Sequence, residues 1–199
     1  SGDINPASAL SDQLTNLFVY TGGPNAYIKF GAFGNAPNAR TLNLKINGTS
    51  LKDTSFVDFR EILAPETYFS PGLISAGSAT VLFTNISSVT TDRMVISYYD
   101  ITYPRQFNFG GATNFSFVLP AKSSDYYLAI TNFNKGAVLP VLYDLTNNGR
   151  YTAVLGGGDT VKFLLPGSSQ QRNLVLVNEE ATNITNVPTL TPKTFINFS

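Results

Sequence analysis

The acidic side chains are the first candidates for chemistry, because paired carboxylates can act as acid and base or bind calcium. Asp53 and Asp58 are five residues apart, so they would point to opposite faces of a continuous strand. Glu179 and Glu180 are neighbours near the expected end of a strand. Neither pair lies in a dedicated ligand loop. Solvated strand edges are therefore the favoured interpretation, and an enzyme acting through paired carboxylates is the less favoured one.

The other residue types that commonly catalyse reactions are missing. The chain contains no His and no Cys, which removes the commonest general base, the commonest zinc ligand and any Cys–His dyad. It has no Gly-x-Ser-x-Gly turn, and Gly156-Gly157-Gly158 lacks the Gly-Lys-Ser/Thr ending of a phosphate-binding loop. We therefore expect this chain to be no enzyme, with no metal site and no cofactor.

The aromatic residues are the remaining candidates, since the chain has ten Tyr and fifteen Phe but no Trp. Tyrosines on an outer sheet face could stack on sugars or dock a neighbouring domain. Packing in the core and across strands is the favoured alternative. The tyrosines in question are Tyr98, Tyr99, Tyr103, Tyr126, Tyr127, Tyr143 and Tyr151.

The charge of the chain excludes two classes of partner. Thirteen basic and thirteen acidic residues cancel, so no long-range field attracts nucleic acid or an anionic membrane. The longest apolar runs, such as Ala137–Leu142, are much shorter than the roughly 20 residues of a membrane-spanning helix. We expect neither nucleic-acid binding nor membrane insertion.

The elements that would carry these residues are predicted to be strands. Short runs of Val, Ile, Thr, Tyr and Phe alternate with Gly, Pro and Asn from Ala26 onward, which is typical of a sandwich or barrel. Thr41–Ile46 alternates with its leucines and isoleucine inward, and Asn47-Gly48 then predicts a type I′ hairpin turn. Met94–Tyr103 is apolar or aromatic on both faces, which predicts a central strand.

Three further turns are predicted to reverse the chain between antiparallel strands. These turns are Asn147-Asn148-Gly149, Gly156-Gly157-Gly158 and Pro166-Gly167-Ser168. Between the strands, Glu61–Tyr68 is interpreted as a short helical or irregular connection. The number of strands favours an all-β, two-sheet antiparallel β-sandwich of the jelly-roll type.

The N-terminal residues are predicted to stand apart from this sandwich. Ser1-Gly2 resembles the scar of a removed tag. Within Ile4–Leu17 the apolar residues have roughly helical spacing, which indicates a short helix or an arm. We therefore expect a tag scar and arm over residues 1–21, followed by one sandwich domain over residues 22–199.

Several segments together resemble a known family. The most specific are Tyr-Asp-Ile-Thr-Tyr-Pro-Arg at 99–105 and Leu-Tyr-Asp-Leu-Thr at 142–146. Gly22-Gly23-Pro24, 127–133, 172–176 and Phe195-Ile-Asn extend the likeness to the end of the chain. These segments are similar to the β-sandwich that precedes the peptidase domain in PorU-like proteins, the gingipain-family cysteine peptidases associated with type IX secretion.

The resemblance implies a role as a non-catalytic structural or docking module. The catalytic Cys and His of that family lie in the following domain, so no catalytic residue carries over. The implied partners are that downstream peptidase domain and other secretion-system or cell-surface proteins. The implied location is exported, at the cell surface or outer membrane of a Gram-negative bacterium, or extracellular.

The residues expected to contact a neighbouring domain are Asp100, Tyr103 and Arg105, because Tyr and Arg are favoured at such surfaces. The alternative is that Arg105 pairs with Asp100 or caps a strand end. An alternative function for the whole chain is a carbohydrate-binding jelly-roll module, which the number of tyrosines and the uncharged polar surface favour.

Overall fold

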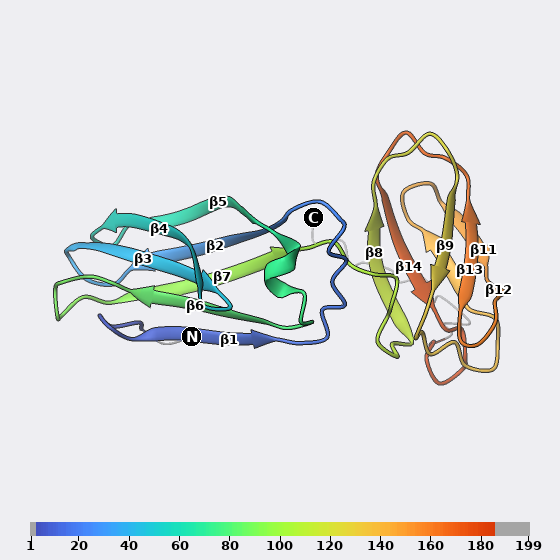
Figure 1. Ribbon diagram of the computed structural model, residues 1–199, viewed down its shortest axis with the longest axis horizontal. Coiled ribbons are helices and arrows are strands. Elements are labelled where there is room, and N and C mark those ends of the chain that lie inside the picture. Colours follow the sequence, from blue (N-terminus) through green and yellow to red (C-terminus); the bar gives the residue numbers. More distant parts are fainter. Residues whose placement is uncertain (1–2, 186–199) are drawn as a thin grey trace, which may run out of the picture. The chain divides into compact units, whose positions relative to one another are not determined.

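The computed structural model describes residues 3–185. These residues form antiparallel strands, one short 3₁₀ helix and no α-helix, which confirms the predicted all-β sandwich class (Figure 1). The suggested tag scar, Ser1-Gly2, and the Phe195-Ile-Asn segment lie outside the described residues. Where the sequence predicted one domain over residues 22–199, the chain divides into two compact units, Ser1–Gln106 and Phe107–Ser199. Two units form because every named strand pairs within its own half and each half has its own core.

The first unit is a sandwich of two sheets with strand orders β1-β6-β3-β4 and β5-β2-β7. A 3₁₀ helix, η1, leads from β5 towards β6. The elements are β1 Ala9–Leu14, β2 Ala26–Gly34, β3 Ala39–Ile46, β4 Thr49–Val57, β5 Glu61–Phe69, η1 Pro71–Ile74, β6 Ala79–Asn85 and β7 Met94–Thr102.

The core of the first unit forms because strands of both sheets alternate buried and exposed residues. In β3, Leu42, Leu44 and Ile46 are fully buried, as predicted from their spacing. Phe30 of β2 and Phe83 of β6 meet edge to face, with ring centroids 5.3 Å apart. This aromatic contact joins the two sheets across the core.

Two segments predicted as helical or irregular are strands. Ala9–Leu14 pairs with β6 over six residues, and Glu61–Phe69 pairs with β2. The helix prediction was wrong because the edge of β6 offers a complete ladder of backbone partners, which outweighs the spacing of four apolar side chains. The arm predicted over residues 1–21 is accordingly part of the sandwich.

The prediction for the β3–β4 hairpin was confirmed, and the prediction for strand β7 was wrong. Asn47 and Gly48 both have positive φ, 47° and 81°, which confirms the type I′ turn. Strand β7 pairs within its sheet only with β2, so the prediction of a central strand was wrong for the part of the chain that the structure describes. The outer face of β7 is uncovered, which leaves Tyr98 and Asp100 exposed.

A buried ion pair closes one end of the first sandwich. Arg40 Nε lies 2.9 Å from Asp92 Oδ1, and both side chains are fully inaccessible to solvent. The carboxylate also accepts hydrogen bonds from Asn38 and Asn85, and Asn85 donates a second one to the carbonyl of Ile4. This network ties the N-terminal segment to β3, to the end of β6 and to the loop before β7.

One hydrogen bond links the two sheets of the first unit and predicts a loss of stability at alkaline pH. The Tyr99 hydroxyl on β7 donates to the Asp12 carboxylate on β1. Burial raises the pKa of Tyr99 to about 12, with the hydrogen bond and negative charge of Asp12 adding to the effect. Since the unfolded phenol ionises near pH 10, this contribution to stability is complete below pH 10 and disappears towards pH 12.

We expect Tyr99→Phe to remove this part of the pH dependence. Denaturant unfolding followed from about pH 9 to pH 12 should show a smaller decline for the variant than for the parent chain. Tyr127→Phe, at an exposed position, is the matched control and should keep the parent's decline. Identical curves for the parent and Tyr99→Phe would contradict the assignment.

The second unit is another sandwich, with strand orders β11-β10-β14-β8 and β12-β13-β9. Its core joins leucines of β10 and β14 to Leu128, Ile130 and Phe163 of the opposite sheet. The strands are β8 Asn114–Leu119, β9 Tyr126–Ile130, β10 Val141–Asp144, β11 Gly149–Thr152, β12 Val154–Leu155, β13 Val161–Leu165 and β14 Arg172–Val177.

Two of the three predicted reversals in this unit are confirmed. The turn around Asn147-Asn148-Gly149 joins paired strands β10 and β11, and Gly156-Gly157-Gly158 joins β12 and β13. The prediction for Pro166-Gly167-Ser168 was wrong, because β13 and β14 lie in different sheets. Asp144 shapes the first turn by accepting bonds from the backbone of 146 and 147, and it pairs with buried Arg172 at 3.1 Å.

Candidate functional site

Exposed tyrosines gather on the outer face of the β5-β2-β7 sheet. Strand β2 turns Ala26, Ile28, Phe30 and Ala32 into the core, so the intervening residues point outward. We call this surface the tyrosine face. Its residues are Tyr27, Lys29 and Gly31 from β2, Leu63, Glu66 and Tyr68 from β5, and Tyr98 and Asp100 from β7.

The residues of the tyrosine face form rows across the sheet. Tyr68 lies opposite Tyr27, and their ring centroids are 5.5 Å apart at an angle of 59°. Leu63 and Tyr98 lie opposite Gly31 from its two sides. Tyr68, Leu63 and Tyr98 are 58%, 66% and 44% exposed, which is far from core packing.

Gly31 makes room for the Tyr98 ring. A Cβ atom at position 31 would lie 2.6 Å from Tyr98 Cε1 and 2.6 Å from the Ser97 hydroxyl. Real side chains do not approach that closely, so any other residue at position 31 would displace the ring. The absence of a side chain therefore lets one edge of Tyr98 rest against the backbone of β2.

The Lys29–Glu66 ion pair holds the neighbouring tyrosines, Tyr27 and Tyr68, in place. Lys29 Nζ lies 3.0 Å from Glu66 Oε1 and 5.3 Å from the centre of the Tyr27 ring, and the Tyr68 hydroxyl donates to Glu66. The hydrogen bond from Tyr68, followed by that from Lys29, lowers the pKa of Glu66. The hydrogen bond to Glu66 raises the pKa of Tyr68 and of Lys29. Tyr68 is therefore protonated and Glu66 charged at neutral pH.

The predicted contact residues occupy two separate places. Arg105 donates to the carbonyl oxygens of Asn16 and Leu17 at 3.1 and 3.0 Å, and to the Tyr103 hydroxyl at 2.9 Å. Its guanidinium also lies 5.0 Å from the centre of the Phe18 ring. Arg105 thus holds the segment that leads into β2. Asp100 lies elsewhere, opposite Lys29 on the tyrosine face. Contact of these three residues with a neighbouring domain stays a prediction.

Sequence reasoning found one of the three tyrosines of this face. Tyr98 was among its candidates, whereas Tyr27 and Tyr68 were not. Tyr99 points into the first core, where it contacts Phe83 with centroids 5.8 Å apart. The alternation of Tyr27, Lys29 and Gly31 with buried apolar residues was the available signal for the outer face of β2.

One of the two acidic pairs considered first lies in each unit. Asp53 accepts a hydrogen bond from Asn43, and Asp58 follows β4 with a positive φ. Glu179 accepts from the Tyr143 hydroxyl and pairs with Arg150 at 2.9 Å. Among residues 3–185, no group of three or more acidic side chains is placed to hold a metal ion. In the same residues no helix is long and apolar enough to cross a membrane.

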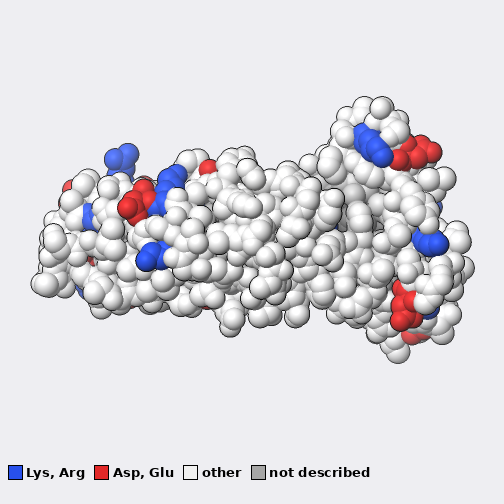
Figure 2. Space-filling model, viewed as in Figure 1, with Lys and Arg blue, Asp and Glu red and all other residues white. Residues whose placement is uncertain are grey.

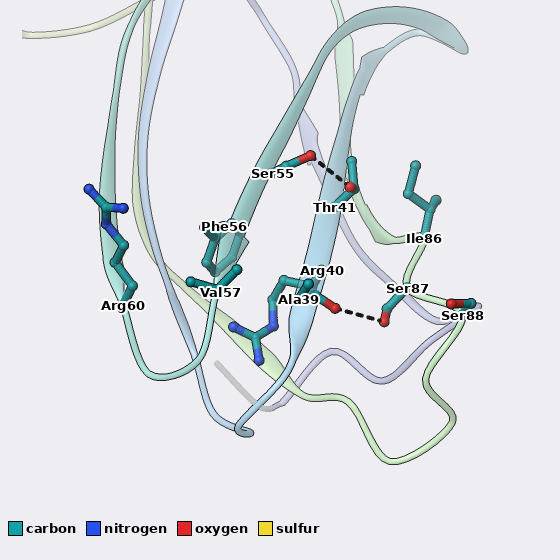
Figure 3. A pocket seen from close by; sticks show the side chains of 10 residues that line it. All are labelled: Ala39, Arg40, Thr41, Ser55, Phe56, Val57, Arg60, Ile86, Ser87 and Ser88. Atoms are coloured by element: carbon teal, nitrogen blue, oxygen red, sulfur yellow. Dashed lines mark hydrogen bonds between the residues drawn. The ribbon is translucent and has the colours of Figure 1, made fainter.

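A separate hollow of about 450 Å³ opens at one end of the β1-β6-β3-β4 sheet (Figure 3). Thr41 and Ser55 share a hydrogen bond of 2.8 Å on its wall, and Ser87 donates to the Ala39 carbonyl. The guanidinium of Arg40, also on the wall, is engaged by Asp92 and by backbone carbonyls. The hollow is lined by Ala39, Arg40, Thr41, Ser55, Phe56, Val57, Arg60, Ile86, Ser87 and Ser88. These residues offer hydroxyl groups and no carboxylate.

The surface around these features carries little charge. Charged residues make up 13% of the sequence, about half the share of an ordinary soluble domain. In the view shown, Lys, Arg, Asp and Glu cover only small separate areas, often with both signs together (Figure 2). Contacts made by either unit should therefore depend on shape, apolar area and hydrogen bonding more than on net charge.

The folds described above are similar to part of one solved structure. The chain matches no known family model and no curated protein sequence. Its fold is similar to a segment of dimeric latent PorU from Porphyromonas gingivalis, with a TM-score of 0.60 and 12% identity over 89% of this chain. The chain spans 18% of the length of that PorU chain.

Two carbohydrate-binding modules match a smaller part of the chain. One is CBM36 in complex with calcium and xylotriose, at 11% identity and a TM-score of 0.38. The other is the CBM36-1 domain of a xylanase from the hindgut metagenome of Trinervitermes trinervoides, at 14% identity and a TM-score of 0.36. Each covers 50% of this chain and 78% or 75% of its own. At these TM-scores neither likeness establishes a shared fold.

The chain is thus defined as an all-β protein of two sandwich units. Among solved structures, its fold is similar to that of the PorU segment stated above.

Proposed function

We propose that this chain is a non-catalytic docking module of an exported, gingipain-like cysteine peptidase of the PorU type. In this role the module packs against the peptidase domain that follows it and holds that domain in place. The observation that carries the proposal is the likeness to a PorU segment, which extends over 89% of this chain but only 18% of PorU. A chain that accounts for so small a part of its structural relative is expected to act as one part of a larger protein.

The residue types of the chain support this role. The active site of a cysteine peptidase requires a Cys, and the chain contains neither Cys nor His. Exposed apolar side chains supply surface for an interdomain contact: Tyr127 and Leu164, opposite each other on β9 and β13, are both 63% exposed. The proposed location follows that of PorU-like proteins, at the surface or outer membrane of a Gram-negative bacterium, or in the medium.

The proposal is tested by calorimetry on the full-length product of the natural gene. If the module docks on a peptidase domain, the two should unfold together, at a higher temperature than the module alone. Phe163→Ala in the second unit, which removes a buried ring from β13, should then also lower the melting temperature of the peptidase domain. Phe59→Ala, at a position 64% exposed, is the matched control and should change neither transition.

Two outcomes would overturn the proposal. One is a natural gene that encodes no peptidase domain after Ser199. The other is a peptidase transition that stays at the same temperature in the Phe163→Ala protein while the transition of the second unit shifts.

A further inference from the structure

We propose that the tyrosine face binds a short, neutral oligosaccharide. In this assignment, sugar rings stack on Tyr98 and Tyr68, and sugar hydroxyl groups bond to Lys29, Glu66 and Asp100. This activity goes beyond docking to a neighbouring domain, and it requires no catalytic group.

The first support is the way Tyr98 is presented. Its ring occupies the space that a side chain at Gly31 would fill, yet 44% of the residue is exposed. A tyrosine held against the sheet on one edge and open to solvent elsewhere offers a fixed apolar surface with a polar tip. Leu63, 66% exposed on the other side of Gly31, continues that surface across the sheet.

The second support is that contacts within the chain already hold the Tyr68 ring in place. Tyr68 is 58% exposed while its hydroxyl is bonded to Glu66 and its ring contacts Tyr27. These contacts fix the ring before any ligand arrives, which lowers the conformational entropy lost on binding. The rows of Tyr27 and Gly31 are four residues apart on β2, or about 13 Å at the usual rise per residue. That separation suits an oligosaccharide better than a single sugar.

The third support is unused hydrogen-bonding capacity. An ammonium group has three donors, and a carboxylate can accept about four hydrogen bonds. Lys29 spends one donor on Glu66, and Glu66 accepts from Lys29 and Tyr68. Both therefore keep sites for sugar hydroxyls, which act as donors and acceptors. Asp100, opposite Lys29, adds a second carboxylate.

The same observations disfavour other ligands. One cation and two carboxylates give the face a negative balance, which opposes nucleic acid and acidic glycans. Strand β2 is paired on both sides, so the middle of the face offers no backbone ladder to an extended peptide. A neutral, hydroxyl-rich ligand with apolar ring faces fits the remaining chemistry.

The test is titration of the chain with short neutral oligosaccharides derived from cellulose, xylan, mannan, chitin and starch. Binding is measured by calorimetry and by amide chemical shifts. We expect at least one of these sugars to bind, and Tyr68→Ala and Tyr98→Ala each to weaken binding by about tenfold or more. Gly31→Ala, which displaces Tyr98, should weaken it as well. Leu145→Ala, at an apolar residue 61% exposed after β10, is the matched control and should bind like the parent.

Each other result overturns the proposal. If none of the sugars binds, the proposed activity is wrong. If a sugar binds equally well to the parent and to folded Tyr68→Ala and Tyr98→Ala, the proposed site is wrong. If a proline-rich peptide binds at this face and no sugar does, the ligand class is wrong. Far-ultraviolet circular dichroism and melting temperatures establish that the variants are folded. The calorimetry on the full-length protein is independent of all these outcomes.

Discussion

Replacing Asp92 by Asn is expected to lower the free energy of unfolding of the first unit by about 3–5 kcal/mol. The substitution keeps the size of the side chain but removes the charge paired with Arg40, which is itself fully inaccessible to solvent. It also replaces an acceptor of hydrogen bonds from Asn38 and Asn85 by a group that is partly a donor. Denaturant unfolding measures the change.

The loss of stability on breaking an ion pair depends on how deeply the pair is buried. An exposed ion pair is therefore the matched control. Lys29→Met breaks the Lys29–Glu66 contact, whose side chains are 44% and 34% exposed, and should lower the free energy of unfolding far less than Asp92→Asn does, because solvent screens the pair. Replacing both Arg40 and Asp92 by apolar residues should destabilise less than Asp92→Asn alone, because no buried charge is then left unpaired. A loss below about 1 kcal/mol for Asp92→Asn would contradict the argument.

The lowered pKa of Asp92 predicts that the first unit loses stability in acid. Burial alone would raise the pKa of Asp92, but the hydrogen bonds from Asn85, Arg40 and Asn38 outweigh burial and hold this pKa below its ordinary value. Its contribution to stability is therefore complete above about pH 4 and is lost as the pH falls through the lowered value. The Asp92→Asn chain should show a flatter stability curve in that acidic range than the parent.

Replacing Phe30 by Ala is expected to lower the free energy of unfolding of the first unit by about 3–5 kcal/mol. The ring is fully buried at the centre of the first core and packs edge to face on Phe83 of the opposite sheet. Its removal loses the transfer free energy of the ring and leaves a cavity that rigid strands on both sides cannot fill. Denaturant unfolding followed by circular dichroism measures the loss.

The effect should be confined to the unit that contains the cavity. Amide hydrogen exchange is expected to speed up in β2, β3 and β6, and to change little in β10, β13 and β14, whose core is separate. Phe59→Ala, at an exposed turn position, should change stability by less than about 0.5 kcal/mol. Equal acceleration of exchange in both units would mean that the two cores unfold as one.

Local signals in the sequence predicted the strands well and their partners poorly. The Asn47-Gly48 turn and the inward leucines of β3 depend on neighbouring residues alone, and both were confirmed. Ala9–Leu14 is a strand because it pairs with the edge of β6, whose residues lie far along the chain (Ala9 pairs with Thr84), so its helical spacing was misleading. One core was predicted instead of two because apolar runs look the same whichever sheet they join.

For the tyrosine face too, the local sequence predicts which side chains point outward but not which strands lie beside one another. Alternation in β2 indicates which residues share a face, but not that Tyr68 lies beside Tyr27. The irregular register between Ile28 and Phe30 decides which residues of β5 lie on this face, and the irregular register between Gly31 and Ala32 does the same for β7. A shift of one residue would exchange the faces of a strand, so the composition of this surface is a property of the folded sheet.

The scarcity of charge on the surface also has a kinetic consequence for any partner. Without long-range electrostatic attraction, the association rate constant should be that of complexes formed without electrostatic steering, about 10⁵–10⁶ M⁻¹s⁻¹. This rate constant should change little with ionic strength. Discrimination between right and wrong partners would then reside in how long each complex lasts rather than in how quickly it forms. A surface of this kind suits a protein that works where the salt concentration is not controlled.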